Sequence, residues 1–323
     1  MRGEGAAMAR IGTVIRDAYR RPGADALPGH LEDRYGIRVT TVTRLDAGVF
    51  RVERGEGPPW VARLSVAARP LARIEEDAEV LRFLERRGFP AERCAHAEPV
   101  STLDGRAVLV TGYVAGKRPP GTPATWRKLG GLLGRLHTMT TEPGPTQRPA
   151  GSLHHLPQYE GGPGQDLAAA AALLADLDGR VPGEHRQLYE LVAKLLPEGD
   201  DCRGLPEAFL HPDPVRGNVI VTAGGPVFVD WAGAGRGPRL ASLAALLHTV
   251  GPAHAGEALA GYRRHTGLTA GELGRLEGAL WIRPLWLAAW QLWLVCVSAK
   301  VSRAFVPDPE YIVALASQVR ASR

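Results

Sequence analysis

Short stretches of alternating hydrophobic and polar residues fill the first third of the chain. Five of them have the period-two pattern typical of β-strands: 39–45, 49–54, 60–64, 98–103 and 107–111. Asp104-Gly105 joins the last two, and this dipeptide is typical of a tight hairpin turn. Helical periodicity is found there in three segments: 11–20, 31–35 and 74–87. The pattern predicts a small antiparallel sheet with few helices.

After residue 112 the pattern becomes mainly helical. Thr122 followed by Pro123 predicts a helix start, because threonine caps the first turn and proline fits its first position. This helix is expected to run to about residue 139. Residues 141–164 are rich in Pro and Gly and predict an irregular insertion. Helical periodicity then continues to the end of the chain, interrupted mainly at 211–231.

The composition is that of a globular protein, with 45% hydrophobic and 23% charged residues. The formal net charge is +5, and its excess lies in residues 1–149, where acids alternate with the arginines. This alternation predicts a solvated surface rather than a nucleic-acid interface. We therefore expect no nucleic acid among the partners.

The three cysteines, Cys94, Cys202 and Cys296, are scattered and show no paired spacing. This argues against a disulfide framework and favours a reducing, cytoplasmic location. The first residues, MRGEGAAMAR, lack the apolar core of a signal peptide. The longest apolar run, 285–297, is interrupted by Gln291 and is shorter than the roughly 20 residues that span a bilayer. We expect a soluble protein without a membrane partner.

The interruption at 211–231 reads HPDPVRGNVIVTAGGPVFVDW and predicts a β-hairpin. With the turn centred on Gly224, Val221 faces Val227 and Asn218 faces Asp230. Opposed side chains in antiparallel strands lie about 5 Å apart on one face of the ribbon. A carboxylate and a carboxamide at that spacing can share one hard cation, and Mg²⁺ prefers oxygen ligands. The hairpin is therefore interpreted as a metal clamp.

Asp213 lies in the loop that leads into this hairpin. Pro212 and Pro214 restrict the backbone on both sides of it, which favours a fixed loop. A carboxylate held near bound metal and phosphate can accept the proton of an attacking hydroxyl. The order of Asp213, Asn218 and Asp230 matches that of protein kinases, in which H-R-D-x-x-x-x-N precedes a metal-binding Asp. The predicted chemistry is phosphoryl transfer.

HPDPVRGN followed by VFVDW resembles the aminoglycoside phosphotransferase family, small-molecule kinases with a protein-kinase-like fold. The family pattern is H-x-D-x-x-x-x-N, a hydrophobic strand ending in D-W, a G-D-P-like turn and a helix. Here Gly237-Pro238 and RLASLAALLH stand in the last two places. Upstream, WVARL resembles the strand with the phosphate-contacting cation, VLVTGYVAG the adenine hinge, and LGGLLGRLH the Leu-His helix.

The resemblance implies an α+β, protein-kinase-like fold of two lobes: a small antiparallel-sheet lobe over 1–112 that binds nucleotide, and a larger, mainly helical lobe over 113–323. It implies transfer of the γ-phosphate of ATP, or of GTP, to a hydroxyl of a small molecule, with Mg²⁺ as cofactor. The acceptor would be an aminoglycoside or another antibiotic, in an enzyme of antibiotic resistance. A metabolic kinase for a sugar, choline or an amino acid, and a nucleotide-binding pseudokinase without transfer, remain alternatives.

The resemblance also assigns roles to individual residues. Asp213 would be the catalytic base and His211 a brace of its loop. Arg63 would contact the phosphates and pair with Asp77 on the following helix. The remaining assignments are Asn218 and Asp230 as metal ligands and Thr111, Tyr113 and Val114 as the adenine hinge. A polycationic aminoglycoside would need an acidic cleft, to which these acids could contribute: Glu160, Asp166, Asp200, Asp201, Glu207, Glu257 and Glu272.

Several positions depart from the family pattern. The strand cation is Arg63 where many members have Lys, and its expected partner is Asp77 instead of Glu. Pro212 and Val215 replace the common Gly and His of the catalytic loop. Ser242 replaces the usual Asp of the helix after the turn. These departures motivate the pseudokinase alternative.

Two further patterns can each be interpreted either as functional or as purely structural. The run GAGRGP at 233–238 has glycines reminiscent of a dinucleotide-binding turn, but their spacing is wrong and no βαβ unit follows. Trp286, Trp290 and Trp293 form a stripe at helical spacing. This stripe favours a core helix, and an aromatic acceptor pocket is the open alternative.

Overall fold

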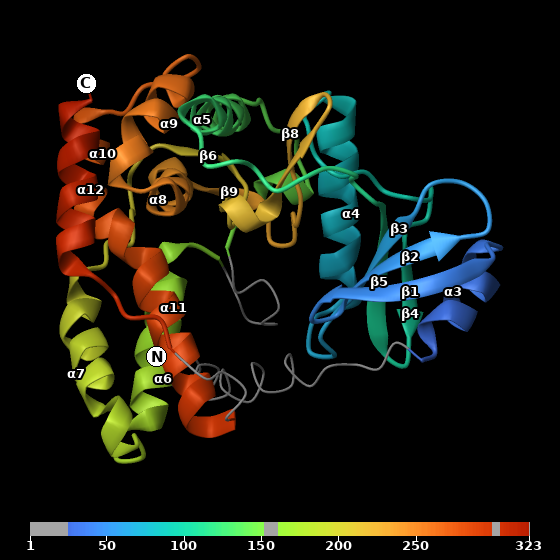
Figure 1. Ribbon diagram of the computed structural model, residues 1–323, viewed down its shortest axis with the longest axis horizontal. Helices are drawn as coiled ribbons and strands as arrows, with labels where there is room; N and C mark the ends of the chain where they lie inside the picture. Colours follow the sequence, from blue (N-terminus) through green and yellow to red (C-terminus); the bar gives the residue numbers. More distant parts are fainter. Residues whose placement is uncertain (1–24, 152–160, 299–303, 323) are drawn as a thin grey trace.

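The computed structural model describes residues 25–151, 161–298 and 304–322, and these form two lobes (Figure 1). The smaller lobe contains an antiparallel sheet with α3 (Leu27–Tyr35) and α4 (Leu71–Arg86), and the larger lobe is mainly helical. The predicted α+β, two-lobe architecture is confirmed. The helix predicted over 11–20 lies outside the described residues.

The sheet of the smaller lobe has five strands in the order β1-β2-β3-β5-β4, and every neighbouring pair is antiparallel. The strands are β1 Val39–Asp46, β2 Val49–Arg54, β3 Trp60–Leu64, β4 Val100–Leu103 and β5 Arg106–Gly112. All five predicted strands are therefore present. Asp104 and Gly105, between β4 and β5, have φ of 49° and 74°, the left-handed values that a tight hairpin turn requires.

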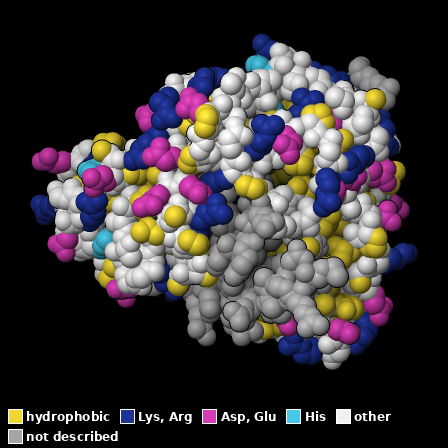
Figure 2. All heavy atoms as spheres, turned by 180° about the vertical axis from the view of Figure 1, so that it is seen from behind, with side chains coloured by type: hydrophobic (Ala, Val, Ile, Leu, Met, Phe, Trp, Pro, Cys, Tyr) yellow, Lys and Arg dark blue, Asp and Glu magenta, His cyan; other side chains and the backbone are white. Residues whose placement is uncertain are grey.

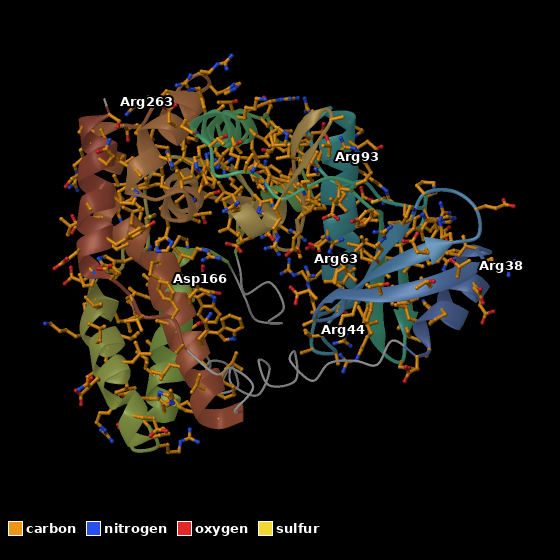
Figure 3. All side chains as sticks on the ribbon, in the orientation of Figure 1. Arg38, Arg44, Arg63, Arg93, Asp166 and Arg263 are labelled. Atoms are coloured by element: carbon orange, nitrogen blue, oxygen red, sulfur yellow. The ribbon has the colours of Figure 1, made fainter. Side chains whose placement is uncertain are left out.

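Alternation along β3 decides which side chains face the larger lobe. Trp60, Ala62 and Leu64 belong to a core that they share with α3. Arg63 points to the opposite face, because successive strand residues alternate between faces. Its partner in β5, Leu109, packs in the core that includes α4 and the larger lobe. Arg63 consequently points toward the larger lobe (Figure 3).

The larger lobe contains eight α-helices among the described residues. They are α5 Pro123–His137, α6 Pro163–Leu177, α7 Arg186–Leu195, α8 Arg239–Val250, α9 Ala255–Tyr262, α10 Ala270–Gly274, α11 Leu276–Ser298 and α12 Pro309–Ala321. Single 3₁₀ turns accompany them: η1 Pro145–Gln147, η2 Gly183–His185, η3 Leu196–Glu198, η4 Arg216–Asn218 and η5 Pro252–His254. Thr122 caps α5 as predicted, since its side chain accepts a hydrogen bond from the Thr125 N–H.

Glycines let α5 and α9 pack backbone to backbone. A Cβ added at Gly130 would lie 1.8 Å from the carbonyl oxygen of Ala258, and one at Gly261 would lie 1.9 Å from that of Arg127. No side chain fits at such distances, so only glycine permits this approach. The LGGLLG pattern of the sequence thus fixes the contact between these two helices.

The tryptophans of the long helix α11 divide between the protein core and a pocket. Trp281 and Trp293 are buried in the core of the larger lobe. Trp286 and Trp290 are half-buried and line a pocket. Within the described residues, Leu276–Val297 is the single helix long and apolar enough to cross a membrane, and 56% of this stretch is buried against the protein. Such burial is that of a core helix.

Two small two-stranded sheets complete the larger lobe: β6 (Glu207–Leu210) with β9 (Gly235–Pro238), and β7 (Val219–Thr222) with β8 (Gly225–Phe228). The GAGRGP run therefore contributes a strand, β9, antiparallel to β6. In a dinucleotide-binding motif the glycines form the turn between a strand and a helix. Here Gly235 and Gly237 belong to the strand itself, which agrees with the rejection of that motif.

The predicted hairpin at 218–230 exists, but its register was wrong by one residue. Ile220, not Val221, pairs with Val227, and Thr222 pairs with Gly225. The turn is tighter than predicted because the Thr222 hydroxyl accepts a hydrogen bond from the Gly224 N–H at 3.1 Å. As a result Asn218 ends the 3₁₀ turn η4 before β7, and its carbonyl accepts from Val229 rather than facing Asp230.

The surface agrees with the charge pattern of the sequence. Over the face shown in Figure 2, basic and acidic side chains are interspersed with one another. Exposed ion pairs of the protein include Arg34 with Glu98 and Arg236 with Glu207. The described surface on this face is therefore one of mixed charge.

Candidate functional site

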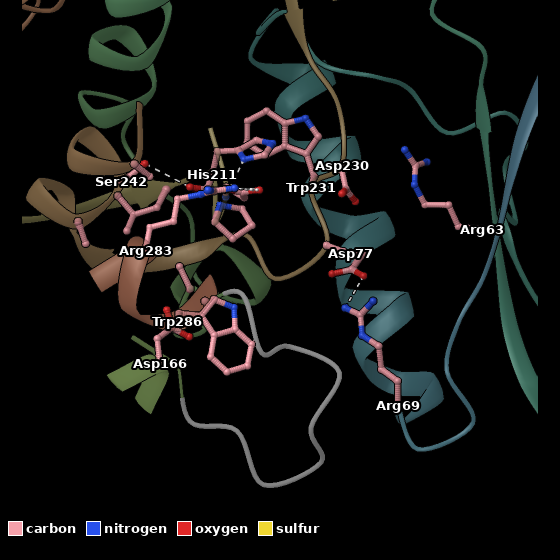
Figure 4. Close-up of a pocket in the computed structure, with 18 of the residues that line it drawn as sticks. Arg63, Arg69, Asp77, Asp166, His211, Asp230, Trp231, Ser242, Arg283 and Trp286 are labelled. Carbon is pink, nitrogen blue, oxygen red and sulfur yellow. Dashed lines mark hydrogen bonds and ion pairs between the residues drawn. The ribbon is translucent and has the colours of Figure 1, made fainter. Parts of the chain in front are cut away.

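A cavity of about 580 Å³ lies between the two lobes, a volume suited to a small-molecule ligand. Figure 4 shows its residues, with Arg63 on the smaller lobe facing Arg283, Trp286 and Asp166 on the larger one. Four of the predicted site residues line it: Arg63, Asp77, Asp213 and Asp230. The other four, Thr111, Tyr113, Val114 and Asn218, are not among its lining residues.

The loop before Asp213 is fixed by His211, which is fully buried. The His211 Nε2–H donates to the Val229 carbonyl at 3.0 Å, and Nδ1 accepts from the Asp213 N–H at 3.1 Å. Both bonds suit a neutral ring. Burial lowers the pKa of His211 to about 4, so the ring stays neutral near neutral pH. His211 is therefore a brace of the loop, as the resemblance implied.

The carboxylate of Asp213 faces the cavity and has two side-chain neighbours. Asn218 donates from Nδ2 to the Asp213 carbonyl at 2.9 Å and lies 3.4 Å from its Oδ2. Arg283 of α11 donates from Nε to Oδ1 at 2.9 Å and from Nη2 to Oδ2 at 3.4 Å. Sequence reasoning missed Arg283. Its one available sign was an isolated cation within the apolar, tryptophan-rich run WIRPLWLAAWQLWL.

Asp230 follows β8 and has φ of 67°, a left-handed conformation that is uncommon for a residue with a side chain. Its N–H donates to Glu92 Oε1 at 2.8 Å, which holds the backbone in this conformation. Enclosure between the lobes raises the pKa of the Asp230 carboxyl; Arg63 acts in the opposite direction, and Glu92 and Asp213 raise it further. The side chain is directed into the cavity, where solvent reaches it.

Glu92 is the partner of Arg63, and sequence reasoning missed it. The Glu92 carboxylate lies 2.8 Å from Arg63 Nη1 and accepts from the Thr111 hydroxyl at 3.0 Å. Glu92 is buried, and it joins the smaller sheet to the Asp230 loop. The expected ion pair between Arg63 and Asp77 was wrong. After α4 the segment around Cys94 runs antiparallel to the end of β5, where Cys94 pairs with Thr111. This position brings the Glu92 carboxylate, and not that of Asp77, against Arg63.

Asp77 has a different set of contacts. Arg69 lies 2.6 Å from one carboxylate oxygen and Arg148 lies 2.5 Å from the other. The Gly233 N–H also donates to Asp77 at 3.4 Å. Because Arg148 and Gly233 belong to the larger lobe and Asp77 to α4, this buried carboxylate fastens the two lobes together. Helical periodicity correctly placed Asp77 on the inner face of α4 but could not select its partners.

Ser242 and Arg216, the neighbour of Val215, both contact the Asp213 loop or its surroundings. The Ser242 hydroxyl donates to the His211 carbonyl at 3.2 Å and so braces the Asp213 loop from α8. Arg216, next to Val215, donates from Nε to the Pro119 carbonyl at 2.9 Å and ties that loop to the connector between the lobes. The loop is thus supported although Ser242 and Val215 replace the usual residues.

The residues predicted to form the adenine hinge lie at and just after the end of β5. The Thr111 hydroxyl is buried and is used by Glu92 and Arg63. The Tyr113 N–H donates to the Pro59 carbonyl at 2.9 Å, and Arg51 lies over the Tyr113 ring, 4.3 Å from its centroid. Thr111 therefore does not line the cavity; its hydroxyl helps to position Glu92 and Arg63, which do.

Comparisons with known proteins agree with this architecture. The amicoumacin kinase hAmiN, solved with AMP-PNP, Ca²⁺ and Ami, is 15% identical with a TM-score of 0.58, over 99% of this chain and 96% of that chain. The choline kinase LicA from Streptococcus pneumoniae is 14% identical with a TM-score of 0.58, over 92% and 97%. An aminoglycoside-3'-phosphotransferase of type VIII is 22% identical with a TM-score of 0.55, over 81% and 98%. These similarities show the fold.

A search of curated proteins returned no match. The model of the phosphotransferase enzyme family matches residues 42–279, which run from within β1 through the hairpin at 218–230 to the start of α11. This match covers well over half of the chain. The chain therefore belongs to the phosphotransferase enzyme family and has the protein-kinase-like fold of its small-molecule kinases.

Proposed function

We propose that the protein transfers the γ-phosphate of ATP, or of GTP, to a hydroxyl of a small molecule. The main support is the placement of Asp213, whose carboxylate is held by a braced loop at the cavity that Arg63 and Asp230 also line. The smaller lobe, 1–112, would bind the nucleotide, and the larger lobe, 113–323, would bind the acceptor. This division places phosphate contacts and acceptor contacts on opposite sides of one cavity.

Asp213 is proposed as the catalytic base. The acceptor oxygen forms a bond to the γ-phosphorus while the bond from that phosphorus to the β–γ bridging oxygen breaks. The electron pair leaves with the nucleoside diphosphate, and the hydroxyl proton goes to a carboxylate oxygen of Asp213. Positioning and electrostatic stabilisation supply most of the rate in such transfers. The bracing by His211 and Ser242 serves that positioning.

Asn218 and Asp230 are proposed as the ligands of a magnesium ion. The Asn218 Nδ2 group is used by Asp213, which leaves Oδ1 for a metal, and Asp230 directs a carboxylate into the cavity. These are hard oxygen donors of the kind that Mg²⁺ accepts together with water and phosphate oxygens. Within the described ranges no group of three His, Cys, Asp or Glu side chains could hold a metal, so phosphate oxygens would complete the set. Bound Mg²⁺ would neutralise phosphate charge.

Arg63 is proposed to contact the phosphates, oriented by Glu92 and Thr111 instead of Asp77. The backbone of Val114 is proposed to bind the adenine. Thr111 is already used by Glu92, and the Tyr113 N–H already donates to Pro59. Tyr113 would then contribute its ring, which Arg51 covers.

We also propose a cytoplasmic location. Cys94, Cys202 and Cys296 are all free thiols, as a reducing compartment would keep them. Burial raises the pKa of Cys94 to about 11 and that of Cys202 to about 12, so neither is poised to react.

The non-transferring alternative is supported by one contact, the ion pair of Arg283 with Asp213, because a base held by a cation is a weaker base. Nucleoside diphosphate release should be measured with ATP and GTP over a panel of hydroxylated acceptors, beside Asp213→Asn and the exposed control Asp178→Asn. Transfer predicts that an acceptor stimulates release in wild type and Asp178→Asn, and that Asp213→Asn loses it by about 10²–10⁴-fold. Tight nucleotide binding without any stimulation would leave the scaffold function instead.

The acceptor panel must separate an antibiotic from a metabolic substrate. Aminoglycosides, macrolides and peptide antibiotics form one arm, and sugars, choline and hydroxylated amino acids form the other. Stimulation confined to one arm would decide between a resistance enzyme and a metabolic kinase.

A further inference from the structure

The acceptor side of the cavity is formed by α8 and α11 of the larger lobe. Apart from Arg283 and Ser242, the described residues that these helices contribute to the cavity are apolar. They are Ala241, Ala245, Ala279, Ile282, Trp286, Leu287 and Trp290. A wall of this composition suits an acceptor with a substantial apolar surface. When the two apolar surfaces come into contact, both are removed from water, which is favourable.

Trp286 and Trp290 give this wall a flat aromatic surface. Their ring centroids are 6.4 Å apart and their planes are 11° from parallel. Both are half-buried at the cavity, whereas Trp281 and Trp293 of the same helix are buried in the core. Two stacked indoles at the edge of a cavity provide a rigid contact area for a planar ring at low cost in side-chain entropy.

Arg283 supplies a cation on this aromatic wall, one helical turn before Trp286. Its guanidinium binds both oxygens of Asp213, at 2.9 and 3.4 Å. The pair is not sealed from solvent, because the side chains of Arg283 and Asp213 are 26% and 36% exposed. A planar guanidinium at this place can bind a second carboxylate or similar anion in the same forked manner.

Of the acids that could have attracted a polycation, Glu160 lies outside the described residues and four others lie in ion pairs. Four arginine partners hold them: Asp200 with Arg275, Glu207 with Arg236, Glu257 with Arg127 and Glu272 with Arg239. Among the described members of the predicted acidic set, Asp166 is the one that lines the cavity. A polycation approaching Asp213 would also meet the charge of Arg283. The acceptor side is thus poorly suited to a polyamine.

We propose that the acceptor is a hydroxylated molecule with a flat apolar or aromatic face and one carboxylate-type anionic group. The inference rests on the proposed phosphotransfer. The flat face lies on Trp286 and Trp290, and the anion binds Arg283. Arg283 then exchanges its contact with Asp213 for one with the acceptor, so that the Asp213 carboxylate is free to accept the hydroxyl proton.

The competition between Asp213 and the acceptor anion gives a distinctive test by calorimetric binding without nucleotide. The probes are indole-3-lactate, its uncharged amide, and the dicationic aminocyclitol 2-deoxystreptamine. Wild type should bind the acid about ten-fold more tightly than the amide. Arg283→Gln should abolish that preference, and Arg320→Gln, an arginine that pairs with Glu277 at the start of α11, should keep it. Asp213→Asn should tighten binding of the acid and not of the amide, because Arg283 loses its competing partner.

Several outcomes would overturn the inference: no binding of the acid, equal binding of acid and amide, preference for 2-deoxystreptamine, or an unchanged Asp213→Asn variant. If Arg283→Gln does not fold, the Asp213→Asn arm decides. Arg283 could instead serve the transferred phosphate, in which case Arg283→Gln weakens ATP binding and leaves the acid preference intact. Since the comparison of the acid with the amide omits nucleotide, it can fail while phosphotransfer stands, and the reverse also holds.

Discussion

Arg63 Nη1 lies 2.8 Å from Glu92 Oε2, and the other oxygen of the same carboxylate accepts from the Asp230 N–H at 2.8 Å. One buried carboxylate therefore positions both the proposed phosphate cation and the backbone of a proposed metal ligand. In this protein Glu92, located after α4, does what the helix residue Asp77 was expected to do. Asp77 is left to join the lobes through Arg69 and Arg148.

Glu92→Gln should weaken ATP binding about ten-fold, because the neutral amide no longer attracts Arg63 and cannot accept as strongly from Asp230. Affinity is measured by calorimetry at fixed Mg²⁺. Asp77→Asn is the contrasting variant. Loss of a buried charge between two arginines should cost about 3–5 kcal/mol of unfolding free energy, measured in urea, and should change ATP affinity less.

The control for both is Glu98→Gln, which removes an exposed pair with Arg34 and should change neither quantity appreciably. If Asp77→Asn weakened ATP binding more than Glu92→Gln did, the assignment of Glu92 as the partner that orients Arg63 would be wrong.

Asp230→Asn should raise the Mg²⁺ concentration needed for half-maximal ATP binding by at least about ten-fold, because a charged oxygen ligand is lost. Removal of divalent ions with EDTA should weaken ATP binding in wild type by more than in the variant. Asp178→Asn, an exposed acid after α6, should behave like wild type. An Asp230→Asn variant with unchanged Mg²⁺ dependence would contradict the metal site.

Stability should fall in mild acid because buried histidines are kept neutral. Burial lowers the pKa of His211 to about 4 and that of His137 to about 3, below the ordinary 6.5. The unfolded chain takes up protons below pH 6.5 and the folded one does not, so stability is complete above pH 6.5 and decreases toward pH 4. Each histidine should contribute about 2 kcal/mol of loss between pH 6.5 and 5.

Urea unfolding at several pH values gives the slope of the unfolding free energy against pH. The slope reports how many protons the chain takes up on unfolding. In His137→Gln this number should be smaller by about one between pH 5 and 6.5, so the slope should decrease by about 1.4 kcal/mol per pH unit. The exposed His265→Gln should leave the slope unchanged. Equal slopes in wild type and His137→Gln would show that His137 titrates normally in the folded protein.

The close contact between α5 and α9 predicts opposite results for two adjacent glycines. Gly130→Ala would place a Cβ 1.8 Å from the Ala258 carbonyl and should cost about 3 kcal/mol or more. At Gly131 the nearest atom would be 3.5 Å away, so Gly131→Ala should be neutral or stabilising by up to about 1 kcal/mol. Thermal and urea unfolding of the two variants test this. Similar stabilities would contradict the packing.

Local patterns predicted a large part of the fold. The strands β1 to β5, the cap of α5 at Thr122 and the inner position of Asp77 on α4 all follow from periodicity or turn chemistry over a few neighbouring residues. The order of Asp213, Asn218 and Asp230 indicated phosphoryl transfer, and the family match agrees with that chemistry. These features are fixed by neighbours in the chain, which the sequence displays directly.

Pairings between distant charges depended on the tertiary structure. Nothing local distinguishes Glu92 from the other acids near α4 as the partner of Arg63, or marks Arg283 as the residue that reaches Asp213. Even the hairpin register differs by one residue from the prediction, and the Thr222 hydroxyl accepts from the Gly224 N–H in its turn. The sequence by itself determined which elements form and which chemistry they can support. The packing of the lobes decided which charged groups meet, because an ion pair requires two separate backbones to bring their side chains within about 3 Å.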